Sequence, residues 1–253
     1  MEQQHLLHTE VVRSKRYFNP KSEDSFKLSR SKIELFMRCQ RCFYLDRRLG
    51  ISQPSGPPFS LNSAVDTLLK KEFDIHRSNQ TVHPLMEAYR IDAVPYQHPL
   101  MDEWRENFKG IHFLYKPAKF IITGAVDDVW LNPKGQLMIV DYKATAKMGE
   151  VSLDAEWQIS YKRQMEIYQW LFRMNQFNVS PIGYFVYCNG STDRKAFDGK
   201  LEFRVKVIPY EGDTRWIEGT LMQIRESLIN DTLPPTTPNC EYCLYRKKAQ
   251  EVE

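Results

Sequence analysis

The stretch that most constrains the fold of this chain is Gly124–Thr145, which reads GAVDDVWLNPKGQLMIVDYKAT. Two runs rich in β-branched and aromatic residues, Phe120–Leu131 and Leu137–Lys143, flank the five residues Asn132–Gln136. Because Asn, Pro and Gly favour turns, this arrangement predicts a β-hairpin.

The register of this hairpin is expected to bring two carboxylates together. If Leu131 pairs with Leu137, counting back along both strands places Asp127 opposite Asp141, with β-carbons about 5 Å apart. Lys143 follows Asp141 by two residues and therefore lies on the same face of the sheet. Two carboxylates and a lysine are thus predicted to converge on one spot.

A pair of carboxylates at this separation repel each other unless a positive charge lies between them. A divalent cation supplies that charge, and all-oxygen ligation suits Mg²⁺ or Mn²⁺. The lysine could hold a phosphate or orient a water molecule. The alternative is a half-exposed hairpin with ordinary surface charges. The apolar runs before each aspartate favour the metal site, because a charge in a strand buried on both faces needs a partner.

The order of these motifs resembles that of a known family. The sequence has GxxD ending at Asp127, then a strand ending in Asp-Tyr-Lys, then Gln164-x-x-x-Tyr168. The pattern resembles the RecB-like branch of the PD-(D/E)XK nucleases, which includes the nuclease domains of RecB and AddB and the CRISPR-associated RecB-like exonucleases. In this resemblance Asp127 matches the motif II aspartate, and Asp141 and Lys143 match the (D/E)xK motif. The QxxxY motif is matched by Gln164 and Tyr168.

The resemblance covers most of the chain, from about Leu28 to Arg246. It implies an α/β fold of the restriction-endonuclease type, in which helices flank a central mixed sheet. It also implies metal-dependent cleavage of DNA, as single strands or duplex ends, by an exonuclease-like enzyme of repair, recombination or defence with a possible helicase partner. The metal ligands it implies are Asp66, Asp127, Asp141 and the backbone carbonyl of Tyr142. Lys143 would help to activate the attacking water.

Asp66 lies in a segment, SLNSAVDTLLKKEFDIHR, that predicts an amphipathic helix. Its apolar stripe consists of Leu61, Ala64, Val65, Leu68, Leu69 and Phe73. On a helix, Asp66 falls at the edge of this stripe and Glu72 near its centre. In the family this helix usually carries a histidine in a G-x-x-x-H pattern, and here Asn62 and Asp66 stand at those two positions. Glu72 is the alternative helix carboxylate, and either acid could instead be solvated.

Two further regions are candidates for substrate binding. Gln164 and Tyr168 share one face of a helix expected over 155–175. The family resemblance places them beside the cleft, whereas spacing alone also fits core packing and a surface amide. The segment Lys27–Arg48 interleaves basic and aromatic residues. Arg38 and Arg41 in it could follow a phosphate backbone, or the segment could be a solvated helix face.

Four of the five cysteines form two CxxC pairs, Cys39 with Cys42 and Cys240 with Cys243. Two such pairs make a complete thiolate set for Zn²⁺ or an iron–sulfur cluster. The stretch between them is too long for a zinc ribbon, so the pairs must meet through the fold. Several RecB-like nucleases carry a 4Fe–4S cluster with one early and three late cysteines, and Ala249 stands near the missing late one. We therefore expect a 4Fe–4S cluster, with zinc or four reduced thiols as alternatives.

Composition sets the remaining limits. The chain has 253 residues, of which 42% are hydrophobic and 26% charged, as in a globular protein with a sizeable core. We expect a flexible arm over residues 1–24 and a single domain over residues 25–248. The net charge of +3 permits nucleic-acid binding without requiring it. No apolar stretch is as long as a membrane span and no signal peptide is evident, which predicts a cytoplasmic protein without membrane contact.

Other interpretations stay open at this point. The chain could be a non-catalytic nuclease-like module that binds nucleic acid as a helicase partner, although loss of the motif residues would be expected then. It could also be a zinc protein whose acidic residues are incidental. The histidines of the two His-Pro pairs, His83 and His98, have no metal-ligand spacing and are expected in turns or on the surface.

Overall fold

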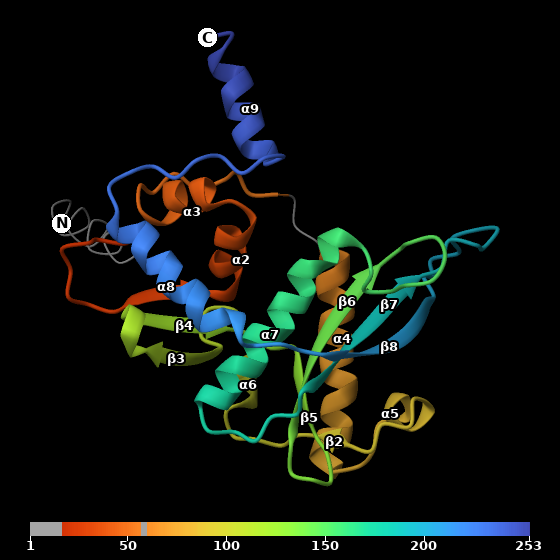
Figure 1. Cartoon of the computed structure of the whole chain (residues 1–253). Coiled ribbons are helices and arrows are strands. Elements are labelled where there is room, and N and C mark those ends of the chain that lie inside the picture. Colours follow the sequence, from red (N-terminus) through yellow and green to blue (C-terminus); the bar gives the residue numbers. More distant parts are fainter. Residues whose placement is uncertain (1–16, 57–59) are drawn as a thin grey trace, which may run out of the picture. The chain divides into compact units, whose positions relative to one another are not determined.

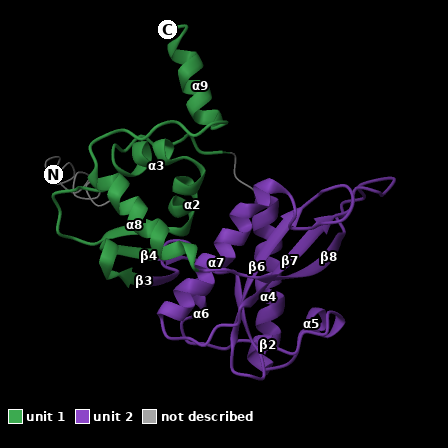
Figure 2. Cartoon of the chain, viewed as in Figure 1, with its two compact units in different colours: residues 1–56, 114–122, 215–253 green, residues 57–113, 123–214 purple. Residues whose placement is uncertain are grey.

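The computed structural model describes residues 17–56 and 60–253, which form two compact units (Figures 1 and 2). Unit 1 contains the described residues up to Gly56, Leu114–Ile122 and Arg215–Glu253. Unit 2 contains residues 60–113 and Thr123–Thr214. The carboxylates, Lys143 and the QxxxY residues all lie in unit 2, whereas the two CxxC pairs lie in unit 1.

Unit 2 is built on a five-stranded mixed sheet in the order β2-β5-β6-β7-β8. The strands are β2 (Val94–Pro95), β5 (Asp128–Leu131), β6 (Leu137–Thr145), β7 (Ile182–Gly190) and β8 (Phe203–Glu211). Strands β6 and β7 are parallel, and the other neighbouring pairs are antiparallel. Leu131 pairs with Leu137 and Asp128 with Val140, which confirms the predicted hairpin register.

The prediction of one strand over Phe120–Leu131 is wrong. The run divides into β4 (Phe120–Gly124) and β5, with a bend at Asp127, and the two strands belong to different sheets. Gly124 lies so close to α7 that a β-carbon there would be 2.5 Å from the ring of Tyr168. The bend releases Asp127 from the ladder, so its side chain turns toward the neighbouring β6.

Two long helices pack on β6 from opposite faces of the sheet. Tyr142 and its even-numbered neighbours face α4 (Ser60–Asn79), while Asp141 contacts α7 (Ile159–Met174), because side chains alternate along a strand. Shorter helices are α5 (Pro84–Ala88), α6 (Met101–Arg105) and the 3₁₀ turn η2 (Glu156–Gln158). Unit 2 therefore has the predicted α/β architecture, a mixed sheet flanked by helices (Figure 1).

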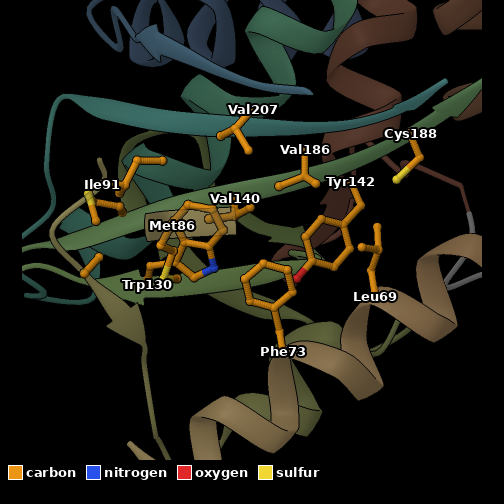
Figure 3. Packing of buried hydrophobic residues seen from close by; sticks show 12 residues of the cluster. Leu69, Phe73, Met86, Ile91, Trp130, Val140, Tyr142, Val186, Cys188 and Val207 are labelled. Carbon is orange, nitrogen blue, oxygen red and sulfur yellow. The ribbon is translucent and has the colours of Figure 1, made fainter. Parts of the chain in front are cut away.

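One hydrophobic core of unit 2 lies between α4 and the sheet (Figure 3). Phe73 of α4 stacks on the ring of Trp130 with 5.5 Å between ring centroids. The buried members of this core are Leu69, Phe73, Met86, Ile91, Ala93, Trp130, Met138, Val140, Tyr142, Val186, Cys188 and Val207. Cys188, the fifth cysteine, is a buried free thiol of this core.

Two predictions about this core are wrong. Leu61 and Leu68 of the predicted stripe are 58% and 64% exposed, because α4 faces the sheet through the narrower row Val65, Leu69 and Phe73, spaced four residues apart. His83, expected in a turn or on the surface, is 1% exposed. Its ring stacks on Phe73 at 3.9 Å, and its Nδ1 accepts the backbone N–H of Leu85 at the start of α5.

Unit 1 combines helices with part of a three-stranded sheet in the order β1-β4-β3. Its elements are β1 (Phe26–Ser29), α2 (Arg30–Arg38), α3 (Gln40–Arg47), the 3₁₀ turn η1 (Lys116–Ala118), α8 (Trp216–Ile229) and α9 (Glu241–Gln250). Strand β3 (Ile111–Tyr115) and β4 carry the chain into and out of η1. None of the described helices has the length and apolar character that crossing a membrane requires.

The expected N-terminal arm falls mainly outside the described residues, which begin at Tyr17. From there to Asp24 the chain has no helix or strand. Phe18 is nevertheless buried, its ring 5.5 Å from that of Phe26, and its backbone N–H donates to the carbonyl of Arg47. The described end of the arm is therefore held against unit 1.

Candidate functional site

Asp141 on β6 is the most deeply buried residue of the predicted catalytic group, with no exposed surface. One carboxylate oxygen accepts from Gln164 Nε2 at 2.7 Å, and the other pairs with the ammonium of Lys143. Gln164 Nε2 also lies 3.1 Å from the hydroxyl of Tyr168, while its Oε1 accepts from Lys143 at 3.4 Å. The structure thus joins the (D/E)xK pair and the QxxxY pair in one hydrogen-bonded group.

Lys143 is held in its charged form. Burial alone would lower its pKa, but the negative charges of Asp141 and Asp127 outweigh this effect, and the pKa of Lys143 is raised. Its ammonium also lies 4.5 Å from the ring centroid of Tyr161, at the distance of a cation–π contact. A lysine that stays protonated can donate hydrogen bonds to a phosphate or a water molecule, but it cannot accept a proton.

Asp127 is placed by the hairpin and by α4. Its Oδ2 accepts the backbone N–H of Tyr142 at 2.7 Å, directly beside Asp141. Its Oδ1 lies 3.7 Å from the ammonium of Lys70, which also lies 2.8 Å from Asp66 Oδ2. Burial and the charge of Asp127 raise the pKa of Asp66 despite this salt bridge. Asp66 of α4 and Asp127 of the bend therefore share Lys70, while Asp141 of β6 pairs with Lys143.

The alternative helix carboxylate, Glu72, points elsewhere. Its side chain is 58% exposed, and Oε1 lies 3.2 Å from Nε2 of the buried His83. The expectation that Glu72 lies near the centre of the buried stripe is therefore wrong, because that stripe is centred on Leu69 and Phe73. Of the two candidate acids of α4, the structure brings Asp66 to Asp127.

Asp128 is a buried acid that sequence reasoning missed. It has no exposed surface, and it accepts hydrogen bonds from Tyr142 Oη at 2.7 Å and Arg105 Nη2 at 3.0 Å, as well as from Arg77. Arg105 Nε in turn donates to the backbone carbonyl of Asp127 at 3.1 Å. The sequence contained a clue to this burial. Two successive acids in a predicted strand, Asp127 and Asp128, point to opposite faces, so one of them faces the interior and needs a buried positive partner.

Asp66 and Lys143 line a cleft of about 320 Å³ in unit 2. Its lining residues are Asn62, Val65, Asp66, Tyr142, Lys143, Ala144 and Tyr161. Asn62, which stands at the glycine position of the family pattern, donates to the carbonyl of Ala144 at 2.9 Å and so joins α4 to the end of β6. The cleft gives a ligand access to Asp66 and Lys143 from the same side.

The carboxylates of Asp66, Asp127 and Asp141 are hard oxygen donors, which suit a hard divalent cation. Lys70 already supplies a positive charge between Asp66 and Asp127. Among the described residues, the Sγ atoms of the four cysteines all lie within 4.8 Å of one another. The carboxylate oxygens of Asp66, Asp127 and Asp141 do not form so compact a group. Binding of a cation by the acids therefore requires Lys70 to move away from between them.

The four cysteines form a separate centre in unit 1, so the two CxxC pairs do meet through the fold. Sγ of Cys42 lies 3.6 Å from Cys240 Sγ and from Cys243 Sγ, and Cys39 Sγ lies 3.7 Å from Cys243 Sγ. Burial raises the pKa of Cys42 to about 11. Although burial also acts on Cys39, hydrogen bonds from the Cys42 backbone and Thr237 lower the pKa of Cys39 to about 6. These hydrogen bonds therefore favour the thiolate form of Cys39.

The basic segment of unit 1 is only partly available for binding. Arg47 and Lys32 pair with the buried Asp46, and Arg48 pairs with Asp231. Arg38 is exposed and Arg41 is half-buried, on either side of Cys39. The predicted phosphate-binding face is therefore reduced to a smaller set that includes these two arginines.

A sequence model of the PD-(D/E)XK nuclease superfamily matches residues 27–247. The chain belongs to this superfamily. The matched region runs through both compact units, and the mixed α/β architecture agrees with the restriction-endonuclease-like fold that the superfamily shares. Its members are nucleases that use divalent metals, so superfamily membership indicates a hydrolase of nucleic-acid phosphodiester bonds.

Other comparisons add little to this assignment. No curated protein matches the chain. A crystal structure of a protein designated SSO0001 aligns over 98% of this chain and 95% of its own, with 17% sequence identity and a TM-score of 0.42, a likeness too low to carry an argument. The PD-(D/E)XK assignment therefore rests on the matched sequence model.

Proposed function

We propose that this PD-(D/E)XK protein is a metal-dependent deoxyribonuclease of the RecB-like branch, with exonuclease-like action on single strands or duplex ends. The observation that carries the proposal is the hydrogen-bonded group of Asp141, Lys143, Gln164 and Tyr168 beside Asp127. Gln164 and Tyr168 are the pair that the sequence resemblance assigns to this branch. Gln164 contacts both (D/E)xK residues directly, and Tyr168 contacts Gln164, which supports a shared role of this pair at the site.

The residues proposed to hold one or two Mg²⁺ or Mn²⁺ ions are Asp66, Asp127, Asp141 and the backbone carbonyl of Tyr142. Such an ion, when bound, lowers the pKa of a coordinated water molecule and stabilises the charge that develops on the phosphate. Lys143, which stays protonated, donates to the phosphate or to the attacking water. Gln164 orients Asp141 and Lys143 from the side of α7, and we propose that Gln164 and Tyr168 also orient the substrate beside the cleft.

Cleavage assays with single-stranded and duplex DNA, with and without Mn²⁺, test this proposal. Asp141→Asn and Lys143→Ala should reduce cleavage by at least about a hundredfold, because each removes a group that acts on the transition state. The matched control is Lys134→Ala in the hairpin turn, which should retain full activity. If the wild-type protein cleaves DNA and both site variants keep its rate, the proposed site is wrong.

The same experiment separates the enzyme from the alternative, a non-catalytic module that binds nucleic acid as a helicase partner. That alternative predicts binding without cleavage under every metal condition. The presence of Asp127, Asp141 and Lys143 in one place favours the enzyme. Action in repair, recombination or defence, and cooperation with a helicase, belong to the proposal as roles expected for the RecB-like branch.

For the four cysteines we propose a single zinc ion in place of the 4Fe–4S cluster that the family resemblance favours. Four sulfurs about 2.3 Å from a zinc ion at tetrahedral angles lie about 3.8 Å apart. The observed Sγ–Sγ separations of 3.6 and 3.7 Å are close to this value. In a 4Fe–4S cluster each thiolate binds a different iron, which sets the sulfurs farther apart.

Metal analysis of anaerobically prepared protein tests the identity of this centre. We expect a colourless protein with about one zinc per chain. A brown protein with absorbance near 400 nm and about four irons per chain would instead establish the 4Fe–4S cluster. Protein with neither metal would support four reduced structural thiols.

A further inference from the structure

Trp157 lies in the 3₁₀ turn η2, directly before α7, and it is more exposed than the other tryptophans. All five lie within the described residues; Trp104, Trp130 and Trp170 are buried, Trp216 is half-buried, and Trp157 is 60% exposed. A single exposed aromatic side chain needs no explanation by itself. Its surroundings, however, distinguish Trp157 from an incidental surface residue.

The first distinguishing feature is the connection of Trp157 to the cleft. Its ring meets the ring of Tyr161 edge to face, with centroids 5.4 Å apart. Tyr161 lines the cleft, and its ring centroid lies 4.5 Å from the ammonium of Lys143. Aromatic surface therefore extends without interruption from the proposed catalytic lysine to the exposed face of Trp157.

The second feature is the rigidity of the turn that carries Trp157. The next residue, Gln158, is buried, and its Oε1 accepts the backbone N–H of Ala155 at 2.9 Å. Its Nε2 donates to the carbonyl of Ser152 at 2.6 Å and lies 3.3 Å from the hydroxyl of Tyr187. Because the turn is fixed on both sides, Trp157 can bind a ligand with little loss of conformational entropy.

The third feature is the charge near the aromatic pair. Lys143 lies on its cleft side, with its ammonium 4.5 Å from the ring centroid of Tyr161. The next cation of α7, Lys162, lies instead near the ring of Tyr210. Aromatic rings next to cations are the combination with which proteins bind single-stranded nucleic acid, since bases stack on the rings and phosphates contact the cations. In a duplex the faces of the bases are covered by their neighbours, so only an unpaired base can use such a site.

We propose that Trp157 and Tyr161 form a stacking site for an unpaired nucleobase next to the phosphate held at Lys143. The protein therefore binds single-stranded DNA in preference to duplex DNA. This inference rests on the proposed nuclease function and specifies the substrate of the same site. Trp157 contacts the substrate but takes no part in the chemistry.

Binding measurements on the full chain test the proposal. The Asp141→Asn variant serves as background so that DNA is not cut, and the probes are a labelled oligothymidylate of about 12 nucleotides and a blunt-ended, fully paired duplex of the same length. Trp157→Ala should weaken oligothymidylate binding about tenfold and leave duplex binding unchanged, while Trp157→Phe should keep most of the affinity. The oligothymidylate should also quench the fluorescence of Trp157, a signal absent from Trp157→Ala.

Tyr89→Ala is the matched control. Tyr89 is an aromatic residue of unit 2 that is 41% exposed and lies at the end of α5, where its hydroxyl contacts Val205 of β8. This variant should bind both probes like the background protein. The proposal is overturned if Trp157→Ala leaves oligothymidylate binding unchanged, or if the variant weakens binding of the oligothymidylate and of the duplex equally. If the background protein binds neither probe although it is folded, the proposed nuclease function fails together with the stacking site.

Discussion

Lys70 is the residue that most affects how the carboxylates of unit 2 could bind a metal. Its ammonium lies 2.8 Å from Asp66 Oδ2 and 3.7 Å from Asp127 Oδ1. Burial and the charge of Asp127 still raise the pKa of Asp66, so Lys70 does not neutralise this group of acids completely. A divalent cation would compete with the ammonium for the same oxygens.

Replacing Lys70 with methionine should therefore tighten Mn²⁺ binding. We expect a gain of about fivefold or more, because a positive charge at this distance opposes the cation by roughly 1 kcal/mol even when well solvated. Titration calorimetry of the wild-type and variant proteins measures the effect without requiring catalysis. Lys71→Met, which removes an exposed charge from the next position of α4, should leave the affinity unchanged. Equal or weaker binding by Lys70→Met would contradict the competition.

Several elements of unit 2 are connected by the buried network around Asp128. Arg105 of α6 binds Asp128 of β5 and also donates to the backbone carbonyl of Asp127 at 3.1 Å. Arg77 of α4, Tyr142 of β6 and the backbone N–H of Val129 also contact the Asp128 carboxylate. The network holds the bend before β5 in place, so it fixes the position of Asp127 without contacting a substrate.

Arg105→Met should lower the free energy of unfolding by about 3 kcal/mol, because it leaves a buried carboxylate with fewer partners. It should also weaken Mn²⁺ binding, since the bend at Asp127 loses its anchor. Urea unfolding and metal titration measure the two effects separately. Arg194→Met breaks an exposed ion pair with Glu202 and should change stability by less than about 1 kcal/mol. A stable Arg105→Met protein with normal Mn²⁺ affinity would show that the network does not position Asp127.

At the scale of the whole molecule, the cysteine centre joins distant parts of the chain within unit 1. Cys39 and Cys243 are 204 positions apart, yet their sulfurs lie 3.7 Å from each other. Cys39 directly precedes α3, and Cys240 directly precedes α9. Closing so long a loop costs entropy, but that cost grows only with the logarithm of its length. Metal binding by four thiolates can offset it, because it contributes directly to the free energy of folding.

Cys243→Ser should therefore lower the melting temperature markedly and remove the bound metal. A strong chelator should lower the melting temperature of the wild-type protein toward that of the variant, and have little further effect on Cys243→Ser. Cys188→Ala changes a buried thiol of unit 2 that lies outside the cysteine centre, and its melting temperature should keep the full response to the chelator. Equal chelator responses in the wild type and Cys243→Ser would contradict a metal-dependent clamp.

Much of the site was predictable because it depends on short-range geometry. The two-residue repeat of a strand and the residues of the turn were enough to predict the register of β5 and β6. The same rules place Asp141 and Lys143 on one face, and the helical period places Gln164 and Tyr168 together. The meeting of the CxxC pairs followed from the number of ligands that one metal centre needs.

The sequence by itself thus determined the hairpin, the shared faces and the pairing of the cysteines, because local backbone geometry and ligand chemistry decide them. Only the tertiary structure decided that Gly124 ends one strand against Tyr168 and that Asp127 lies in a bend. It likewise decided that Leu68 stays exposed and Asp128 is buried. These outcomes depend on which segments pack together, since the burial of a side chain is set by neighbours far away in the sequence.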